Sequence, residues 1–209
     1  MRVAACFHGF LRTGASMWWV ARRLRAMGYA EVILPTFGYH LRPLGDNVEA
    51  AALLVEKMRA RHPEARLDVV THSYGGILAR AVFARDGVIP PHRVLMFSPP
   101  NRGAVTARKV RATLPVHHTG WDPLGPMLPG VPEGLPLPRA QVGVLTGGLG
   151  HARGFNPLLG ADNDGTVRVD EAYIDGLTAF EVVPILHALM PIAPRTLDGM
   201  ERFLNSGRF

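Results

Sequence analysis

Two hydrophobic patterns alternate along the chain. In the first, apolar residues form short, nearly continuous runs bounded by Gly, Pro or polar residues, which is typical of strands buried in a parallel sheet. We predict six such strands, at residues 2–7, 31–34, 67–71, 93–97, 141–146 and 180–183.

In the second pattern, apolar residues recur every three or four positions, as they do on one face of a helix. This spacing predicts helices at residues 15–27, 46–61, 75–85, 104–113 and 194–204. For the second of these helices, Asp46 or Asn47 is the expected N-terminal cap. Strands that alternate with helices indicate an α/β fold, with a mainly parallel sheet of about six strands and helices on both faces.

The pattern breaks between residues 101 and 138, where Pro and Gly are frequent and periodicity is weak. Long irregular segments inside compact domains often serve function, for example as lids over an active site. We therefore expect a lid-like excursion here, with a passive insertion as the alternative. The 209 residues carry no other sign of a boundary, so we expect residues 1–209 to form a single domain.

Charge and composition narrow the classes of function. The net charge is +6, but the clusters at 22–25 and 108–111 lack a nucleic-acid-binding motif, so we expect no nucleic-acid partner. The sequence has no apolar run of about 18 residues, which argues against an integral membrane segment. The apolar stretch at residues 1–7 is too short for a signal peptide. The single cysteine, Cys6, has no internal disulfide partner. These features favour a cytoplasmic location.

The segment around Ser73 carries the clearest chemical signal. The predicted strand 67–71 leads into His72-Ser73-Tyr74-Gly75-Gly76, and a predicted helix follows. This is a nucleophile-elbow pattern, G-x-S-x-G, with Thr71 in the first glycine position. Such a sharp turn exposes the serine hydroxyl at the carboxyl edge of the sheet, and small residues are needed on either side of it. Ser73 is therefore the predicted nucleophile.

A second turn lies beside the elbow in the expected fold. His8-Gly9-Phe10 directly follows the first strand, and Gly9 allows a close approach of the backbone. We expect the backbone N–H groups of Phe10 and Tyr74 to form an oxyanion hole.

The base and the acid are expected after the nucleophile, in the chain order Ser, Asp or Glu, His. Among the histidines, His187 alone lies between the last predicted strand and the terminal helix, so it is the predicted base. Asp162 and Asp164 both follow the strand that ends near residue 146. We favour Asp164 as the acid and Asp162 as a turn-forming neighbour.

These motifs resemble a known family. Phe7-His8-Gly9-Phe10, the elbow at 70–77, Ser98-Pro99-Pro100-Asn101-Arg102-Gly103-Ala104 and Asn163-Asp164-Gly165-Thr166-Val167 resemble small bacterial lipase-like α/β-hydrolases, related to class 2 lipases and to the GPI inositol-deacylase-like group. The resemblance covers nearly the whole chain. It implies a minimal α/β-hydrolase fold and a triad of Ser73, Asp164 and His187. The paired prolines at 191 and 194 depart from the family pattern downstream of His187.

The function expected from these residues is hydrolysis of carboxylic esters, as in esterases and lipases, through an acyl-enzyme. The alternatives are an acyltransferase with the same triad and a non-catalytic binding module on the same fold. We expect no cofactor and no metal, and a small-molecule or lipid ester as the substrate. The residues predicted to contact this substrate are Leu11, Trp18, Met127 and Leu128.

Overall fold

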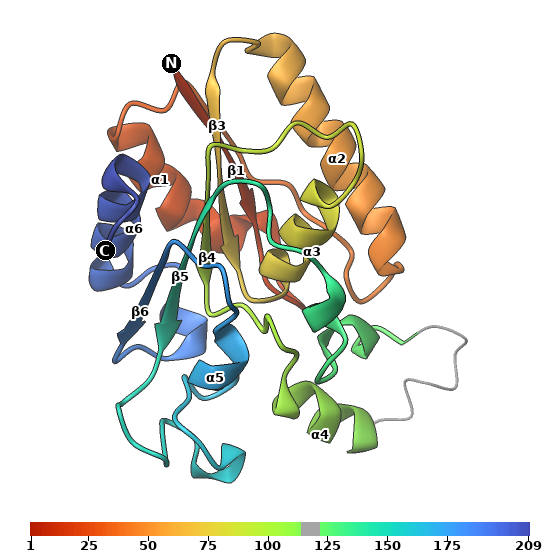
Figure 1. The fold of residues 1–209 in the computed structure, drawn as a ribbon, viewed down its shortest axis with the longest axis vertical. Helices are drawn as coiled ribbons and strands as arrows, with labels where there is room; N and C mark the ends of the chain where they lie inside the picture. The colour runs from red at the N-terminus through yellow and green to blue at the C-terminus, as the bar shows by residue number, and fades with distance from the viewer. Residues whose placement is uncertain (114–121) are drawn as a thin grey trace.

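A computed structural model describes residues 1–113 and 122–209 of the chain. Its centre is a six-stranded sheet in the order β2-β1-β3-β4-β5-β6, and every neighbouring pair of strands is parallel (Figure 1). The strands are β1 (Arg2–Phe7), β2 (Glu31–Ile33), β3 (Arg66–His72), β4 (Arg93–Phe97), β5 (Gln141–Gly147) and β6 (Ala179–Val183). Each lies within two residues of its predicted bounds, so the predicted α/β class and strand count are confirmed.

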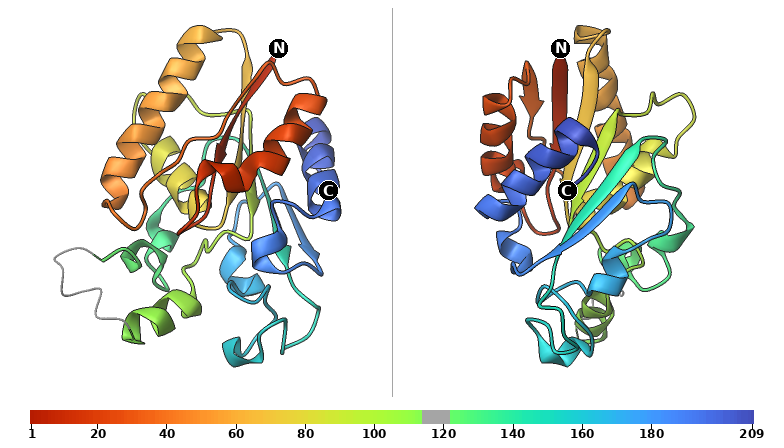
Figure 2. Two further views of the ribbon diagram at one scale, coloured as in Figure 1. Left: turned by 180° about the vertical axis from the view of Figure 1, so that it is seen from behind. Right: turned by 60° about the vertical axis from the view of Figure 1, so that its left-hand side comes forward.

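Helices cover both faces of the sheet, because successive side chains of a buried strand point to opposite faces. Val3, Ala5 and Phe7 of β1 pack with helices α2 (Leu44–Arg61) and α3 (Tyr74–Phe83), whereas Ala4 and Cys6 pack with α1 (Trp18–Ala26) and α6 (Pro194–Ser206). Figure 2 shows α1 and α6 together on their side of the sheet. The resulting three layers leave the carboxyl ends of the strands open at one edge.

Residues 101–113 and 122–131 lie beyond that edge, together with the loop that follows β5 (Figure 1). The described part of the segment 101–138 contains α4 (Val105–Thr113) and two 3-10 turns, Gly125–Met127 and Pro132–Gly134. The short helix α5 (Val169–Ala172) lies nearby and was not predicted. Residues 114–121 of the predicted lid-like excursion lie outside the described residues.

Arg80 of α3 ties both ends of this excursion to the body of the protein. Its side chain is fully buried and donates a hydrogen bond of 2.9 Å to the carbonyl of Asn101, and others to the carbonyls of Leu135 and Pro136. Burial lowers the pKa of this guanidinium to about 10, so it remains charged at neutral pH. The excursion is thus anchored where it leaves the sheet and where it returns.

Two details of the helix predictions are wrong. Neither Asp46 nor Asn47 caps α2, which begins two residues earlier at Leu44; Asn47 is buried within the helix, and its side chain donates to the carbonyl of Pro43. The predicted helix 15–27 is divided into a 3-10 turn, Gly14–Met17, and α1. Hydrophobic spacing shows which face of a helix is buried, but it does not show at which residue the helix begins.

Candidate active site

Ser73 sits at the junction of β3 and α3 in a strained backbone conformation. Its φ is 53° and its ψ is −123°, a region that L-residues rarely adopt. The backbone N–H of Ser73 donates to the carbonyl of Phe97 at 2.8 Å, which fixes the turn against β4. The predicted sharp turn is therefore present, and it is held by the neighbouring strand.

Glycines allow the backbone to pack closely around this turn. A Cβ on Gly75 would lie 2.4 Å from the carbonyl oxygen of Phe7, and a Cβ on Gly9 would lie 3.2 Å from the Cβ of Ser73. The start of α3 and the loop after β1 therefore meet at the elbow. Thr71, in the first glycine position of the motif, is fully buried.

Asp164 and His187 form a hydrogen-bonded pair at the same edge of the sheet. Nδ1 of His187 donates to Oδ2 of Asp164 at 2.7 Å, and the Asp164 side chain is fully buried. The other carboxylate oxygen, Oδ1, accepts from the backbone N–H groups of Thr166 at 2.9 Å and Val167 at 2.7 Å. The two residues are also joined through the backbone, where the N–H of His187 donates to the carbonyl of Asp164 at 2.9 Å.

His72, next to the serine in the sequence, contacts His187. Its Nε2 lies 3.0 Å from the carbonyl oxygen of His187, and the two rings are 4.8 Å apart. Because His72 is buried, desolvation holds its pKa well below the ordinary value, and the charges of His187 and Arg12 lower it further. His72 is thus neutral and donates from Nε2 to the carbonyl of His187. From the sequence, we assigned His72 only to the turn.

The two expected oxyanion donors lie on either side of the elbow. Phe10 follows Gly9, and Tyr74 is the first residue of α3, where backbone N–H groups have no partner within the helix. In the part of the chain that the structure describes, neither N–H donates to a protein acceptor. Their rings pack together, with centroids 6.0 Å apart.

The side chain of His8 holds the loop that carries Phe10. Its Nε2 accepts from the backbone N–H of Phe37 at 2.9 Å, so its Nδ1 carries the proton and donates to the carbonyl of Gly9 at 2.8 Å. Burial lowers the pKa of His8, in keeping with this neutral form.

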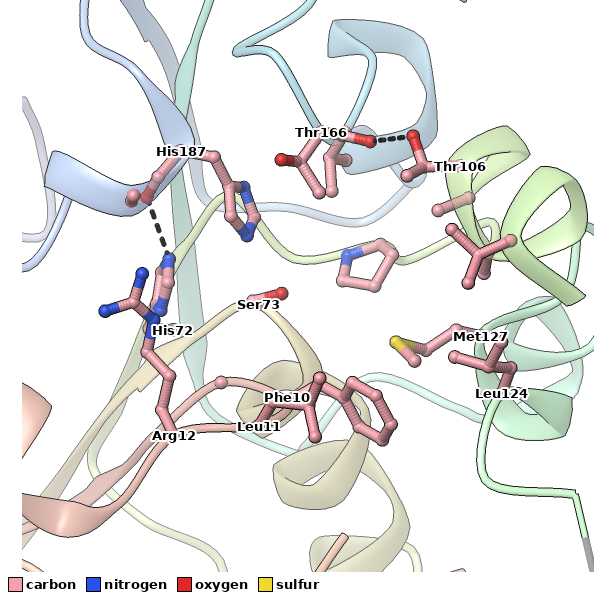
Figure 3. Close-up of a pocket in the computed structure, with 17 residues that line it drawn as sticks. Phe10, Leu11, Arg12, His72, Ser73, Thr106, Leu124, Met127, Thr166 and His187 are labelled. Carbon is pink, nitrogen blue, oxygen red and sulfur yellow. Dashed lines mark hydrogen bonds between the residues drawn. The ribbon is translucent and has the colours of Figure 1, made fainter. Parts of the chain in front are cut away.

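A cavity of about 320 Å³ opens above Ser73, and the rings and side chains around it are shown in Figure 3. Ser73 and His187 both line it. Its wall includes several apolar side chains: Phe10, Ala104, Ala107, Val110, Leu124, Met127 and Val167. An apolar chain of moderate length therefore has a place to lie next to the serine.

Helix α4, which forms one wall of the cavity, is fixed to the loop that carries Asp164. The N–H of Val105 donates to the buried carboxylate of Glu171 at 2.7 Å, and the hydroxyl of Thr106 donates to the carbonyl of Thr166 at 2.6 Å. Glu171 also accepts from the N–H of Arg168 at 2.8 Å. Helix α4 and the loop that carries Asp164 are therefore joined by hydrogen bonds.

Of the residues predicted to contact substrate, Leu11 and Met127 line the cavity and Trp18 and Leu128 do not. Trp18 begins α1, on the opposite face of the sheet from α3, and its ring packs against Trp19 at 4.8 Å. Leu128 follows the 3-10 turn in extended backbone, and its carbonyl faces Gly103.

The sequence analysis did not assign a substrate contact to several other lining residues, among them Arg12, Pro100, Thr106 and Val110. Arg12 lies two positions after the motif His8-Gly9-Phe10, and Pro100 lies within the quoted motif 98–104, so these motifs were an available signal. Thr106 and Val110 lie on the predicted helix 104–113, but the sequence carried no signal for where this helix packs.

Searches against known proteins give a fold but no close relative. No family model matches the sequence, and no curated protein matches it. Among solved structures, the mature form of the Bacillus licheniformis lipase BlEst2 superposes with a TM-score of 0.72 at 14% identity, over 98% of this chain and 91% of that one. Its propeptide form gives a TM-score of 0.77 at 17% identity, over 97% of this chain and 50% of that one.

The chain has the α/β-hydrolase fold. The Pyrococcus furiosus esterase PF2001 also superposes, with a TM-score of 0.64 at 18% identity, over 98% of this chain and 81% of that one. The strand order and the position of the elbow agree with the fold that the sequence motifs implied. Within the described residues, no helix is long and apolar enough to cross a bilayer.

Proposed function

We propose that this α/β-hydrolase is a serine hydrolase that cleaves carboxylic esters through an acyl-enzyme. The observation that carries the proposal is the 2.7 Å pairing of His187 with the buried Asp164 at the cavity that the strained Ser73 also lines. A serine hydroxyl needs an oriented base to become a nucleophile, and a buried carboxylate on Nδ1 of the imidazole supplies that orientation.

The proposed reaction starts with attack of Ser73 Oγ on the ester carbonyl while Nε2 of His187 takes the hydroxyl proton. The carbonyl oxygen becomes an oxyanion, which the N–H groups of Phe10 and Tyr74 stabilise. His187 then gives its proton to the departing alkoxide, leaving an acyl group on Ser73. A water molecule, deprotonated by His187, releases the carboxylic acid and restores the serine.

Labelling with a fluorophosphonate tests the nucleophile. We expect the probe to modify Ser73 in the folded protein, because only an activated serine reacts with it at neutral pH. Peptide mass analysis locates the adduct. Undiminished labelling in Ser73→Ala would show that another residue is the nucleophile.

The pair Asp164→Asn and Asp162→Asn tests the acid, with hydrolysis of p-nitrophenyl hexanoate as the assay. Asp162 accepts from the N–H groups of Leu149 at 2.8 Å and Gly150 at 2.9 Å, and so closes a turn away from the imidazole. We expect kcat to fall by roughly 10⁴-fold in Asp164→Asn, which loses the correct tautomer of His187. Asp162→Asn should mainly lower thermal stability. A larger loss of kcat in Asp162→Asn would contradict the assignment.

A series of p-nitrophenyl esters from acetate to palmitate tests the substrate class. The cavity of about 320 Å³ supports a preference for acyl chains of intermediate length. Repeating the assay with a chelator present separates this mechanism from metal-hydroxide catalysis, which chelation would abolish. Activity that returned only on adding zinc would refute the serine mechanism.

A further inference from the structure

The cavity is chemically divided, with Ser73 between the two parts. Figure 3 shows Phe10, Leu124 and Met127 on one side of the serine, and Arg12 with His72 and His187 on the other. Arg12 is the one lining residue of the described chain with a permanent charge, and none of the lining residues is an Asp or Glu. The side of Arg12 is therefore suited to a negative group and the opposite side to an apolar one.

A strained turn places Arg12 at the cavity. Leu11 has a φ of 54°, which is uncommon for a residue other than glycine, and the N–H of Arg12 donates to the carbonyl of Gly9 at 3.3 Å. The bend lets Phe10 and Arg12, only two positions apart, face the cavity from opposite sides of Ser73 (Figure 3). Backbone strain of this kind tends to be retained where a site requires it.

The guanidinium of Arg12 is available for an outside ligand. Its side chain is exposed at the cavity, and none of the ion pairs found among residues 1–113 and 122–209 involves it. In contrast, Arg23 on α1 is paired with both Asp198 and Glu201. Guanidinium groups bind carboxylates and phosphates through two parallel hydrogen bonds, so an oxyanion is the natural partner of Arg12.

The proposed mechanism fixes which part of an ester meets Arg12. The group that protonates the leaving oxygen must lie within hydrogen-bond reach of it. That group is His187, which lies on the same side of Ser73 as Arg12 (Figure 3). The leaving alcohol therefore lies toward Arg12, and the acyl chain lies toward Phe10 and Met127.

We propose that the substrates of this site are esters with an apolar acyl chain and a carboxylate or phosphate on the leaving alcohol, and that Arg12 binds this anion. The proposal rests on the serine-hydrolase function proposed above. It adds a specificity determinant, Arg12, and a chemical class of leaving group.

The test compares three matched hexanoate esters, whose alcohols are 4-hydroxybenzoate, 4-hydroxyphenyl phosphate and the neutral 4-hydroxybenzamide. The quantity measured is the ratio of kcat/KM for each anionic ester to that for the neutral ester. We expect Arg12→Gln to lower this ratio about tenfold, the equivalent of about 1.4 kcal/mol. Arg12→Glu should lower it further, and added salt should lower it in the wild type. The two anionic esters separate a carboxylate preference from a phosphate preference.

Arg22→Gln is the matched control, because Arg22 is an exposed arginine outside the cavity that lies over the rings of Trp18 and Trp19. An equal fall of the ratio in Arg22→Gln would mean that general surface charge is responsible, and the proposal would be overturned. A ratio that is unchanged in Arg12→Gln would overturn it as well.

A binding measurement separates failure of this proposal from failure of the proposed function. The ethers 4-hexyloxybenzoate and 4-hexyloxybenzamide cannot be hydrolysed, and calorimetric titration gives their Kd in each variant. If no ester is hydrolysed but the benzoate binds more tightly than the amide in wild type and not in Arg12→Gln, the anion site stands and the hydrolase proposal fails. If esters are hydrolysed but the two ethers bind alike, the anion site is refuted and the hydrolase proposal stands.

Discussion

Replacement of Ser73 by glycine should make the protein more stable while removing the proposed nucleophile. The φ of 53° and ψ of −123° at this position are favourable for glycine and strained for residues with a Cβ. Such strain costs about 1–3 kcal/mol. Glycine also increases the conformational entropy of the unfolded chain, which lowers the stability by about 0.4–1 kcal/mol. The net stabilisation expected for Ser73→Gly is therefore about 0.5–2 kcal/mol.

Ser73→Ala is the control, because alanine lacks the hydroxyl but keeps the Cβ and with it the strain. For a chain of 209 residues, each 1 kcal/mol shifts Tm by about 2–4 °C. We therefore expect the Tm of Ser73→Gly to exceed that of Ser73→Ala by roughly 1–8 °C in calorimetry. Both variants should lose fluorophosphonate labelling. A Tm for Ser73→Gly at or below that of Ser73→Ala would refute the inference that the elbow stores strain.

Three further predictions concern the interior. Burial raises the pKa of the Cys6 thiol to about 12, so we expect it to resist a disulfide reagent in the folded protein and to react once urea unfolds the chain; rapid reaction in the native state would contradict its burial. His8 and His72 have folded pKa values below the unfolded value of about 6.5, so the unfolded chain binds more protons and stability should fall as pH drops below about 6.5. Urea titrations at pH 7 and pH 5 measure how the free energy of unfolding changes with pH. We expect His72→Gln to reduce this change by up to about 1.4 kcal/mol per pH unit relative to the wild type, and an equal change in both proteins would mean that His72 is not held neutral. Gly75→Ala would bring a Cβ to 2.4 Å from the carbonyl of Phe7, so we expect loss of both stability and esterase activity; a fully active, equally stable variant would show that α3 can move away from β1.

Local information in the sequence was sufficient for the order of the elements and for the elbow. Buried parallel strands are nearly continuous apolar runs, and β4 was predicted at its observed bounds, Arg93–Phe97, because Pro99 and Pro100 stop it. The small residues around Ser73 predicted the sharp turn, because only they allow the backbone approach that Gly75 makes. The parallel sheet followed from the alternation of strands and helices.

Tertiary structure decided which side chains share the cavity. Trp18 and Met127 are both large and apolar, and nothing in the sequence distinguishes them. Met127 lines the cavity because the excursion folds back over the carboxyl ends of the strands, whereas Trp18 lies on the other face of the sheet. Asp162 and Asp164 likewise differ in their hydrogen bonds to distant segments: the carboxylate of Asp162 closes a turn, and that of Asp164 reaches His187, which is 23 positions away in the sequence. Periodicity reports which face of an element is buried, but contacts between loops depend on where the whole chain brings them.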